Sequence, residues 1–316
     1  MSQILHKRDL KKLSIVVPVF QNQGSLPTLF EKLKILESTL LESGTSLECI
    51  FVNDGSNDNS LEILRNLKKI RPHWILINLS RNFGAVNSSK TGLGFVTGDA
   101  FIILAADLQD PPELILRMCQ EYMNGSDFVI CEREDRDDPF FTKVFARFYY
   151  LILRTFVISD YPRGGYDFAL MDRKMLQPIY ESSKSMYTPI LAWWLGFKPF
   201  TIKYHRSHRQ HGKSAWTFSK KFNSALDIFL GFSKKPIRFL TLTGFLVAMV
   251  SFIFGTLIFI SAVTHRIDVP GYATIVIFLS FMFGVVITML GVIGEYLIRV
   301  FEEVNKRPFS VIESIE

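Results

Sequence analysis

Between residues 13 and 131 the chain alternates between short apolar runs and amphipathic stretches. The apolar runs are rich in β-branched residues and predict buried strands at 13–19, 47–53, 74–80, 100–105 and 127–131. Helical spacing of apolar positions predicts helices at 25–42, 57–69, 88–96 and 112–123, and proline opens the last of these. Strands that alternate with helices of about 12 residues indicate an α/β fold with a doubly wound, mostly parallel sheet.

Two long stretches near the C-terminus, 239–263 and 272–294, contain no charged residue. At 1.5 Å per residue each helix would be roughly 35 Å long, enough to cross a hydrocarbon core of about 30 Å. The short link between them predicts a hairpin of two transmembrane helices. Basic residues flank the hairpin on both sides, and the positive-inside rule therefore predicts that both ends lie in the cytoplasm: Lys234, Lys235, Arg238, Arg299, Lys306 and Arg307.

The segment between the predicted sheet and the hairpin is aromatic and basic. Residues 140–158 combine aliphatic and aromatic residues with a narrow stripe of basic ones, which favours a helix at the membrane interface. A core helix with snorkelling basic ends is the alternative. Residues 198–221 contain no acidic residue and lead toward the hairpin.

The charge and the cysteines narrow the class of protein. A formal net charge of +6 and a pI near 9.1 suit an anionic partner, which can be nucleic acid, anionic lipid or a phosphorylated substrate. The three cysteines are odd in number and lie inside predicted elements, so we expect no disulfide framework and a reducing compartment. The first residues are polar and basic, and we expect no signal peptide there.

Carboxylates follow two of the predicted strands. Asp107 with Gln109 can supply a partial shell for Mg²⁺ or Mn²⁺, which often takes one or two protein carboxylates and completes its shell with phosphates and water. Alternatively, Asp107 and Asp110 cap the helix that the following prolines introduce. We favour the capping role for Asp110 and leave both readings open for Asp107. Asp54 can accept a hydrogen bond from a base or a ribose.

Two further segments carry candidate chemistry. Asp167 lies beside glycines before an apolar strand, where an acid is either a turn residue or a catalyst. Residues 205–218 contain three histidines at intervals of three, which raises the possibility of zinc. Arg206, Arg209 and Lys213 surround a glycine there, and we therefore favour a phosphate-binding loop.

Together these segments resemble a known family of enzymes. The stretches VPVF, VNDGSNDNS, LSRNFG, ADLQDPPE, GYDFALMDR, RQHGKS and GEYLIRVFEEVNKRP occur in this order and cover nearly the whole chain. The chain is similar to the inverting polyprenyl-phosphate glycosyltransferases of the GT-A fold, which include dolichol-phosphate mannose synthases and bactoprenol-phosphate glucosyltransferases. The resemblance implies transfer of a sugar from a nucleotide-diphosphate sugar to an undecaprenyl or dolichyl phosphate at the cytoplasmic face of the cytoplasmic or ER membrane.

The resemblance also implies roles for individual residues. Pro18, Phe20 and Asp54 would hold the nucleotide, and Arg209 with Ser214 would bind its diphosphate. The remaining roles are Asp107 and Gln109 for Mg²⁺ or Mn²⁺, Arg133 and Lys213 for the acceptor phosphate, and Asp167 for catalysis.

The chain departs from the family pattern at two places. The family commonly has D-x-D where this chain has Ala105-Ala106-Asp107, and Y-N-E where it has Phe20-Gln21-Asn22. Each change removes a carboxylate near the donor, so we expect a metal held with one protein ligand fewer.

The resemblance implies a division of the chain and a set of partners. We expect a nucleotide-sugar-binding half at 1–138, an acceptor-side half at 139–235, the membrane helices within 236–300 and a cytoplasmic tail at 301–316. The partners would be the sugar donor, the lipid acceptor and membrane lipid, and not nucleic acid. Gly284, Gly291 and Gly294 can allow close helix packing and hence a homo-oligomer.

Three other functions fit part of the sequence. A processive polysaccharide synthase would carry a Q-x-x-R-W motif, which Trp216 lacks, and more membrane spans. A catalytically impaired nucleotide-binding homologue would explain Ala105, but it need not retain Gln109, Asp167 and Arg209 together. A lipid-binding scaffold explains the basic segments but not ADLQDPPE.

Overall fold

The computed structural model describes most of the N-terminal two thirds of the chain and a long C-terminal helix. Its described residues are 7–133, 150–151, 153–155, 157–162, 165–183, 186–205, 238, 242–247, 249–250, 253, 256–257, 260, 264, 271–305 and 307–316. They divide into two compact units, residues 1–227 with 308–316 and residues 228–307.

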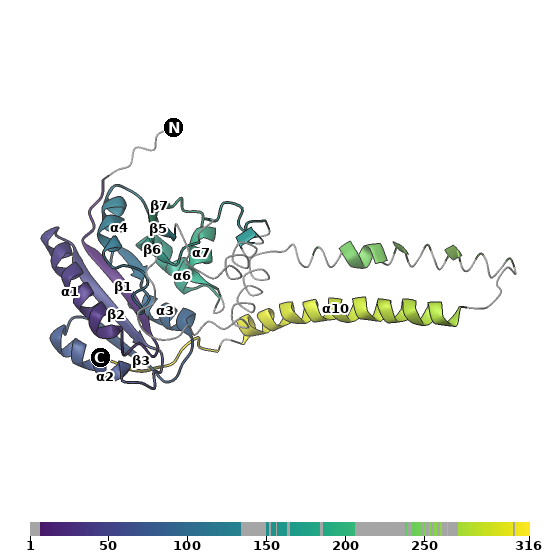
Figure 1. The fold of residues 1–316 in the computed structure, drawn as a ribbon, viewed down its shortest axis with the longest axis horizontal. Coiled ribbons are helices and arrows are strands. Elements are labelled where there is room, and N and C mark those ends of the chain that lie inside the picture. The colour runs from purple at the N-terminus through teal and green to yellow at the C-terminus, as the bar shows by residue number, and fades with distance from the viewer. Residues whose placement is uncertain are drawn as a thin grey trace. The chain divides into compact units, whose positions relative to one another are not determined.

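The first unit is built on a mixed sheet, drawn in Figure 1. Its described strands follow the order β7-β5-β6-β4-β1-β2-β3-β8. Their bounds are β1 Lys12–Val19, β2 Ser46–Asn53, β3 Ile75–Leu79, β4 Ala100–Ile103, β5 Phe128–Arg133, β6 Phe168–Asp172, β7 Phe200–Tyr204 and β8 Ile312–Ile315. The first five confirm the strands that the apolar runs predict, and the sheet confirms an α/β fold.

Helices cover both faces of this sheet. Their bounds are α1 Leu26–Glu42, α2 Ser60–Ile70, α3 Ala85–Leu93, α4 Leu114–Met123, α6 Leu176–Tyr180 and α7 Thr188–Trp194, with a 3₁₀ turn at Arg173–Met175. Alternate residues of β1, including Leu13 and Ile15, are buried in the core that α1 and α4 share. Val16 points to the opposite face, where a Cβ on Gly92 of α3 would come within 2.4 Å of its side chain. This alternation is what a strand buried on both faces requires.

Two strands run against the parallel direction. β6 pairs antiparallel with both β4 and β5, and β8 pairs antiparallel with β3 at the edge of the sheet. β8 lies in the segment that the sequence identifies only as a tail. The backbone N–H and C=O of Glu316 bond to Leu76 at 2.8 and 3.0 Å, so the end of the chain closes the β3 edge.

The capping role expected for Asp110 is wrong. α4 begins at Leu114, its N-cap residue is Glu113, and no side chain caps it. Asp110 is buried instead and accepts a hydrogen bond from the hydroxyl of Tyr204. The side chain is therefore committed to a contact between distant segments and not to the start of its own helix.

In the second unit, α10 spans Tyr272–Val304, and at 1.5 Å per residue its 33 residues measure roughly 50 Å. Residues 281–298 make it the one helix among the described residues that is long and apolar enough to cross a membrane. It contains the second expected span and continues past it. Most of the first expected span lies outside the described residues, as do 134–149 and 206–237.

Candidate functional site

The ends of three neighbouring parallel strands meet at one edge of the sheet. Val19 pairs with Asn53, and Ile103 pairs with Val16, so the loops after β1, β2 and β4 emerge together. Among the described residues, the non-glycine residues with left-handed φ are Gln21 at 56° and Leu108 at 60°, and both lie in these loops. Strained backbone of this kind is maintained where the surroundings require it, commonly at ligand sites.

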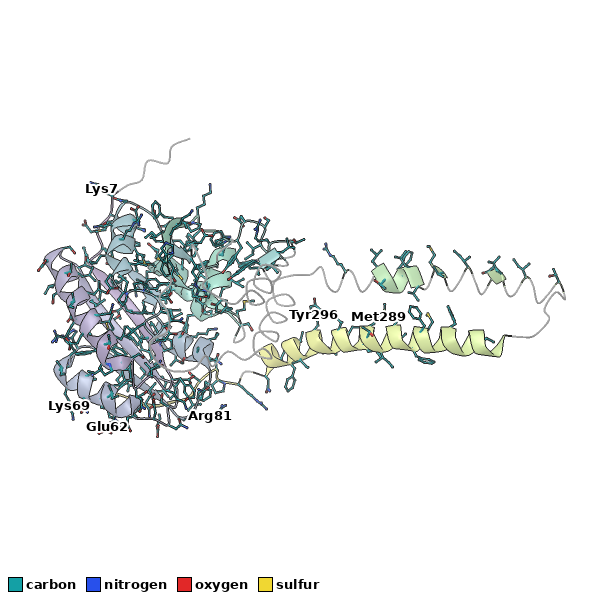
Figure 2. All side chains as sticks on the ribbon, in the orientation of Figure 1. Lys7, Glu62, Lys69, Arg81, Met289 and Tyr296 are labelled. Atoms are coloured by element: carbon teal, nitrogen blue, oxygen red, sulfur yellow. The ribbon has the colours of Figure 1, made fainter. Side chains whose placement is uncertain are left out.

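Asp54 follows β2 and organises the neighbouring loop. Its side chain is buried, and its two oxygens accept from the backbone N–H groups of Phe83 and Gly84 at 2.7 and 2.9 Å. Burial raises the pKa of Asp54, and these two bonds only partly oppose the rise. The loop that Asp54 holds contains Arg81, labelled in Figure 2, whose guanidinium lies 4.2 Å from the centre of the Phe83 ring. Asp54 thus joins the end of β2 to the start of α3.

Asp107 and Gln109 lie in a tight turn after β4. The Oδ1 atom of Asp107 accepts from the backbone N–H of Gln109 at 3.2 Å, with left-handed Leu108 between them. Both side chains are half-buried. No three His, Cys, Asp or Glu side chains within the described ranges gather closely enough to hold a metal. One carboxylate and one amide fit a divalent ion that shares its shell with a phosphate ligand, and not an ion held by protein alone.

The other expected nucleotide contacts lie on the same edge. Pro18 is half-buried near the end of β1, and Phe20 is 37% exposed just after it. Arg209, Lys213 and Ser214 lie outside the described residues.

A charged pair lies at the same edge of the sheet. Arg133 ends β5, Asp167 precedes β6, and an Nη2 hydrogen of Arg133 donates to Oδ2 of Asp167. Arg133 is buried, whereas the Asp167 side chain is 39% exposed. Burial alone would lower the pKa of Arg133, but Asp167, Tyr204 and Asp110 together outweigh it and raise that pKa.

The Arg133–Asp167 pair lies near the turn that contains Asp107 and Gln109. Ile102 of β4 lies opposite Leu170 of β6 in an antiparallel register. Asp167, three residues before Leu170, is therefore set beside the residues that follow β4. The structure thus brings together Asp107, Gln109, Arg133 and Asp167, which the sequence places up to 60 residues apart.

Two tyrosines that the sequence analysis missed contact this pair. The hydroxyl of Tyr187 donates to Oδ1 of Asp167, and the hydroxyl of Tyr204 lies close enough to the Arg133 guanidinium to help raise its pKa. Tyr204 is the register partner of Arg133 in the parallel pairing of β5 with β7. No local motif marks either tyrosine, because the register of β7 places Tyr204 and the start of α7 places Tyr187.

Aromatic rings pack together beside the segment that contains Asp167. Tyr161 stacks with Tyr166 at 5.7 Å between centroids, and Trp193 approaches Tyr161 at 5.4 Å. The hydroxyl of Tyr166 donates to the backbone carbonyl of Pro189 in α7. This layer fixes the segment around Asp167 against the start of α7.

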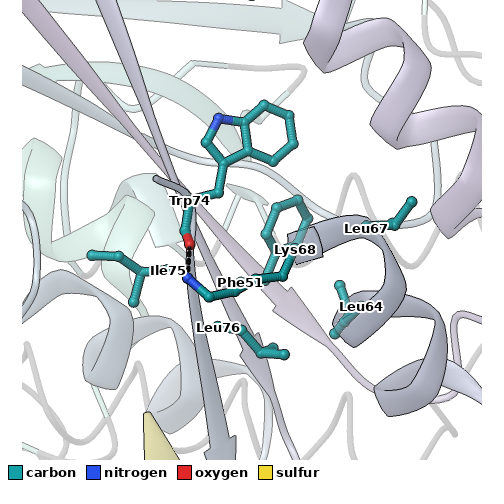
Figure 3. Close-up of a pocket in the computed structure, with 7 residues that line it drawn as sticks. All are labelled: Phe51, Leu64, Leu67, Lys68, Trp74, Ile75 and Leu76. Atoms are coloured by element: carbon teal, nitrogen blue, oxygen red, sulfur yellow. Dashed lines mark hydrogen bonds between the residues drawn. The ribbon is translucent and has the colours of Figure 1, made fainter. Parts of the chain in front are cut away.

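The hollow shown in Figure 3 lies elsewhere, between α2 and the strands beside it. Its lining is mainly apolar, and Lys68 closes it by donating to the Trp74 carbonyl at 2.7 Å. It contains none of the predicted site residues, so we assign it no role in binding.

Comparison with known proteins bears on the family of this chain. The family model described as glycosyl transferase family 2 matches residues 14–180. The chain is 34% identical to an uncharacterized glycosyltransferase of Synechocystis sp., over 96% of this chain and 95% of the relative. It is 30% identical to the bactoprenol glucosyl transferase of Shigella phage SfX, over 96% of this chain and 99% of the relative.

Among solved structures, the chain is similar to a glucosyl-3-phosphoglycerate synthase from Mycobacterium tuberculosis. The identity is 15%, the match covers 69% of this chain and 76% of the other, and the TM-score is 0.47. A likeness this distant carries no argument about the site.

Proposed function

Because the chain belongs to glycosyl transferase family 2 and is a glycosyltransferase, we propose that it moves a hexose from a nucleotide-diphosphate sugar to a polyprenyl phosphate. The observation that carries this proposal is the meeting of a strained donor-side turn with the Arg133–Asp167 pair at one sheet edge. The relatives named as bactoprenol glucosyl transferases support a lipid acceptor, since the similarity extends over nearly the full length of both chains.

The donor would bind over the ends of β1, β2 and β4. Ligands of doubly wound sheets bind beyond the carboxyl ends of the strands. Pro18 and Phe20 would contact the nucleotide, and Asp54 would contact it through the loop that it holds. Arg209 and Ser214 would bind the diphosphate.

Asp107 and Gln109 would hold Mg²⁺ or Mn²⁺ together with the donor diphosphate. When bound, the ion would neutralise charge on the departing nucleoside diphosphate. Arg209 would help to neutralise the same negative charge on the nucleoside diphosphate. A turn that offers one carboxylate suits this shared arrangement.

The acceptor phosphate would approach from the Arg133 side. The second pKa of a phosphate monoester is about 6, so its attacking oxygen is mostly ionised near neutral pH. A base is then hardly needed at the acceptor. The charge of Asp167 would instead stabilise the positive charge that develops on the sugar ring. Arg133 and Lys213 would hold the phosphate for direct displacement with inversion at the sugar carbon.

The membrane would bring the lipid to this site. The exposed apolar surface of α10 supports one membrane span, and the uncharged stretch 239–263 supports a second that completes a hairpin. Flanking basic residues favour a cytoplasmic catalytic unit at the cytoplasmic or ER membrane. Residues 140–158 would lie at the interface, and the glycines of α10 would allow a homo-oligomer.

The test is an assay of the purified full-length protein. Labelled UDP and GDP sugars are each incubated with undecaprenyl or dolichyl phosphate and Mg²⁺ or Mn²⁺, and the lipid fraction is identified by mass spectrometry. We expect one sugar nucleotide to yield a lipid-linked hexose. Nucleotide binding without any product would instead identify an impaired homologue, and growth of a polymer would identify a polysaccharide synthase.

A further inference from the structure

Arg133 lies between two carboxylates that come from different loops. Asp167 accepts directly from Nη2 of Arg133. Tyr204, the register partner of Arg133, also lies beside the guanidinium, and the Tyr204 hydroxyl donates to Oδ1 of Asp110. Arg133, Asp110 and Tyr204 are all buried.

Tyr204 is placed by the sheet and not by a loop. It is the last residue of β7, and its backbone is in register with Arg133 at the end of β5. Its partner Asp110 lies three residues after Asp107, on the same connection to α4 that carries the expected metal ligands. The hydroxyl therefore links Arg133 to the donor-side turn.

Tyr187 acts on the opposite end of the pair. Its hydroxyl donates to Oδ1 of Asp167, while Arg133 occupies Oδ2. Tyr187 is the N-cap residue of α7. The start of α7 also contacts the residue before Asp167, because the Tyr166 hydroxyl donates to the Pro189 carbonyl.

We propose that Tyr204 and Tyr187 are positioning residues for the Arg133–Asp167 pair. Tyr204, anchored on Asp110, fixes the plane of the guanidinium, and Tyr187 fixes the second oxygen of the Asp167 carboxylate. This role rests on the proposed function, in which Arg133 and Asp167 act on the acceptor and the sugar. Neither tyrosine needs to touch the substrate.

The physical reason lies in the geometry of the two groups. A carboxylate held at one oxygen can rotate about its last bond, whereas one held at both oxygens cannot. A guanidinium is planar, so its remaining N–H groups point in fixed directions once one is bonded and a neighbouring ring limits rotation. Misplacement of a catalytic group by about 1 Å can cost about 100-fold in rate.

If the two tyrosines had a purely structural role, their loss would affect activity no more than the loss of a comparable tyrosine away from the site. Tyr122 provides the matched comparison, because it is buried and its hydroxyl donates to a carboxylate, Oδ2 of Asp172, at 3.1 Å. Asp172 ends β6, whereas Asp167 lies before its start. Tyr122→Phe therefore removes an equivalent bond away from the site.

The experiment compares Tyr204→Phe, Tyr187→Phe and Tyr122→Phe in the full-length protein. We expect all three to lower the unfolding temperature by similar amounts. Only Tyr204→Phe and Tyr187→Phe should lower kcat, by about 10- to 100-fold. The KM for the sugar nucleotide should stay within about two-fold of wild type, because positioning acts after the donor is bound.

Two further readouts separate positioning from loss of structure. A hydrogen bond to a carboxylate favours its charged form, so Tyr187→Phe should move the acidic limb of the kcat profile to higher pH. Asp110→Asn combined with Tyr204→Phe should be no worse than Tyr204→Phe alone, since both break one chain of bonds.

The proposal is overturned if Tyr204→Phe and Tyr187→Phe keep the kcat of Tyr122→Phe, or if they change only the KM of the sugar nucleotide. A Tyr187→Phe profile that coincides with wild type also contradicts it. The wild-type assay tests the proposed function, whereas the ratio of variant to wild-type rates tests the positioning role, so the two can fail separately.

Discussion

The carboxylate of Asp54 accepts a hydrogen bond from the backbone N–H of Gly84 at 2.9 Å, and this bond holds the loop after β3 against the end of β2. The two loops approach each other so closely that no side chain fits at position 55. A Cβ placed on Gly55 would lie 2.4 Å from the carbonyl carbon of Arg81. Gly55 also has a φ of 61°, which L-residues rarely adopt.

Gly55→Ala should therefore be more damaging than Gly44→Ala. Gly44 has a φ of 80°, but nothing lies within 4 Å of its Cβ position. Gly44→Ala should cost about 1–2 kcal/mol from the left-handed backbone alone. Gly55→Ala adds a clash with the Arg81 backbone, and we expect a total of about 3 kcal/mol or more. Urea unfolding of the two variants measures both losses of stability.

Nucleotide binding provides the second comparison for these variants. Because Gly55 lies beside Asp54, which we propose to act in nucleotide binding, Gly55→Ala should weaken binding of the nucleoside diphosphate, whereas Gly44→Ala should leave it unchanged. Titration calorimetry on the folded proteins checks this. Equal affinities for the two variants would show that the contact between Gly55 and Arg81 does not shape the nucleotide site.

Sequence periodicity predicted the elements whose signals are local. The runs that become β1 to β5 are apolar on both faces, and the carboxylates after β2 and β4 follow from where those strands end. Periodicity cannot show pairing partners. The antiparallel direction of β6 and the edge strand β8 depend on contacts with residues far away in the chain, and β8 is separated from β3 by more than 200 residues.

The candidate site likewise contains residues that the sequence indicates and residues that only long-range contacts reveal. Asp107 and Gln109 could be selected from the sequence because they follow a strand. Asp110 looked like a helix cap because prolines follow it, but the buried hydroxyl of Tyr204 outweighs that local preference. Tyr204 and Tyr187 could not be selected, since what marks them is the register of β7 and the start of α7.

Removal of residues 312–316 should expose the β3 edge. β8 pairs antiparallel with β3, and Asn78 of β3 donates to Glu313 at 2.6 Å. An unpaired edge with apolar residues promotes association between chains. We expect a lower unfolding temperature and concentration-dependent aggregation of the truncated protein, measured by calorimetry and light scattering.

Glu316→Gln is the control for this truncation. It keeps the backbone pairing of Glu316 with Leu76 and removes the negative charge that pairs with Arg65. That pair is solvent-exposed, so the unfolding temperature should hardly change. If Glu316→Gln were as damaging as the truncation, the ion pair and not the strand would close the edge.

Glu48 should make stability depend on acidic pH. It is buried and accepts from Lys12, Ser14 and Thr97 at 2.6–3.0 Å. Burial would raise the pKa of Glu48, but these bonds outweigh it and lower the pKa below its ordinary value of 4.5. A lowered carboxyl pKa contributes stability above the unfolded value, and that stability is lost as the pH falls through the folded value.

Glu48→Gln should therefore be less stable than wild type at pH 7, by about 2 kcal/mol. The difference should shrink as the pH falls below 4.5, the ordinary value for this carboxyl. Urea unfolding between pH 3 and pH 7 measures it. A difference that stays constant over this range would mean that the charge of Glu48 contributes nothing.

Removal of the divalent ion should abolish transfer. We expect EDTA to stop turnover, added Mg²⁺ or Mn²⁺ to restore it, and Asp107→Ala to stay inactive at any metal concentration, because the turn offers one carboxylate. Ala105→Asp should lower the metal concentration needed for half-maximal rate without being required for activity. Full turnover in EDTA would contradict the metal role, and activity confined to Ala105→Asp would identify the natural chain as impaired.

Asp167→Asn tests whether this carboxylate acts as a base. In most inverting glycosyltransferases a carboxylate takes a proton from an acceptor hydroxyl as it attacks. A lipid phosphate with a second pKa of about 6 is mostly ionised at neutral pH and offers little proton to remove. The structure holds Asp167 between Arg133 and Tyr187, which suits a fixed negative charge.

Asp167→Asn keeps the shape of the side chain and removes its charge. If the charge only orients Arg133 and stabilises the sugar ring, the variant should be slower but retain measurable turnover, because the phosphate still attacks without a base. Its rate should show no new dependence on pH above about 7, where the phosphate is already ionised. Rates measured from pH 6 to pH 9 check this. A rate that collapses at pH 7 and recovers steadily as the pH rises would show that Asp167 removes a proton.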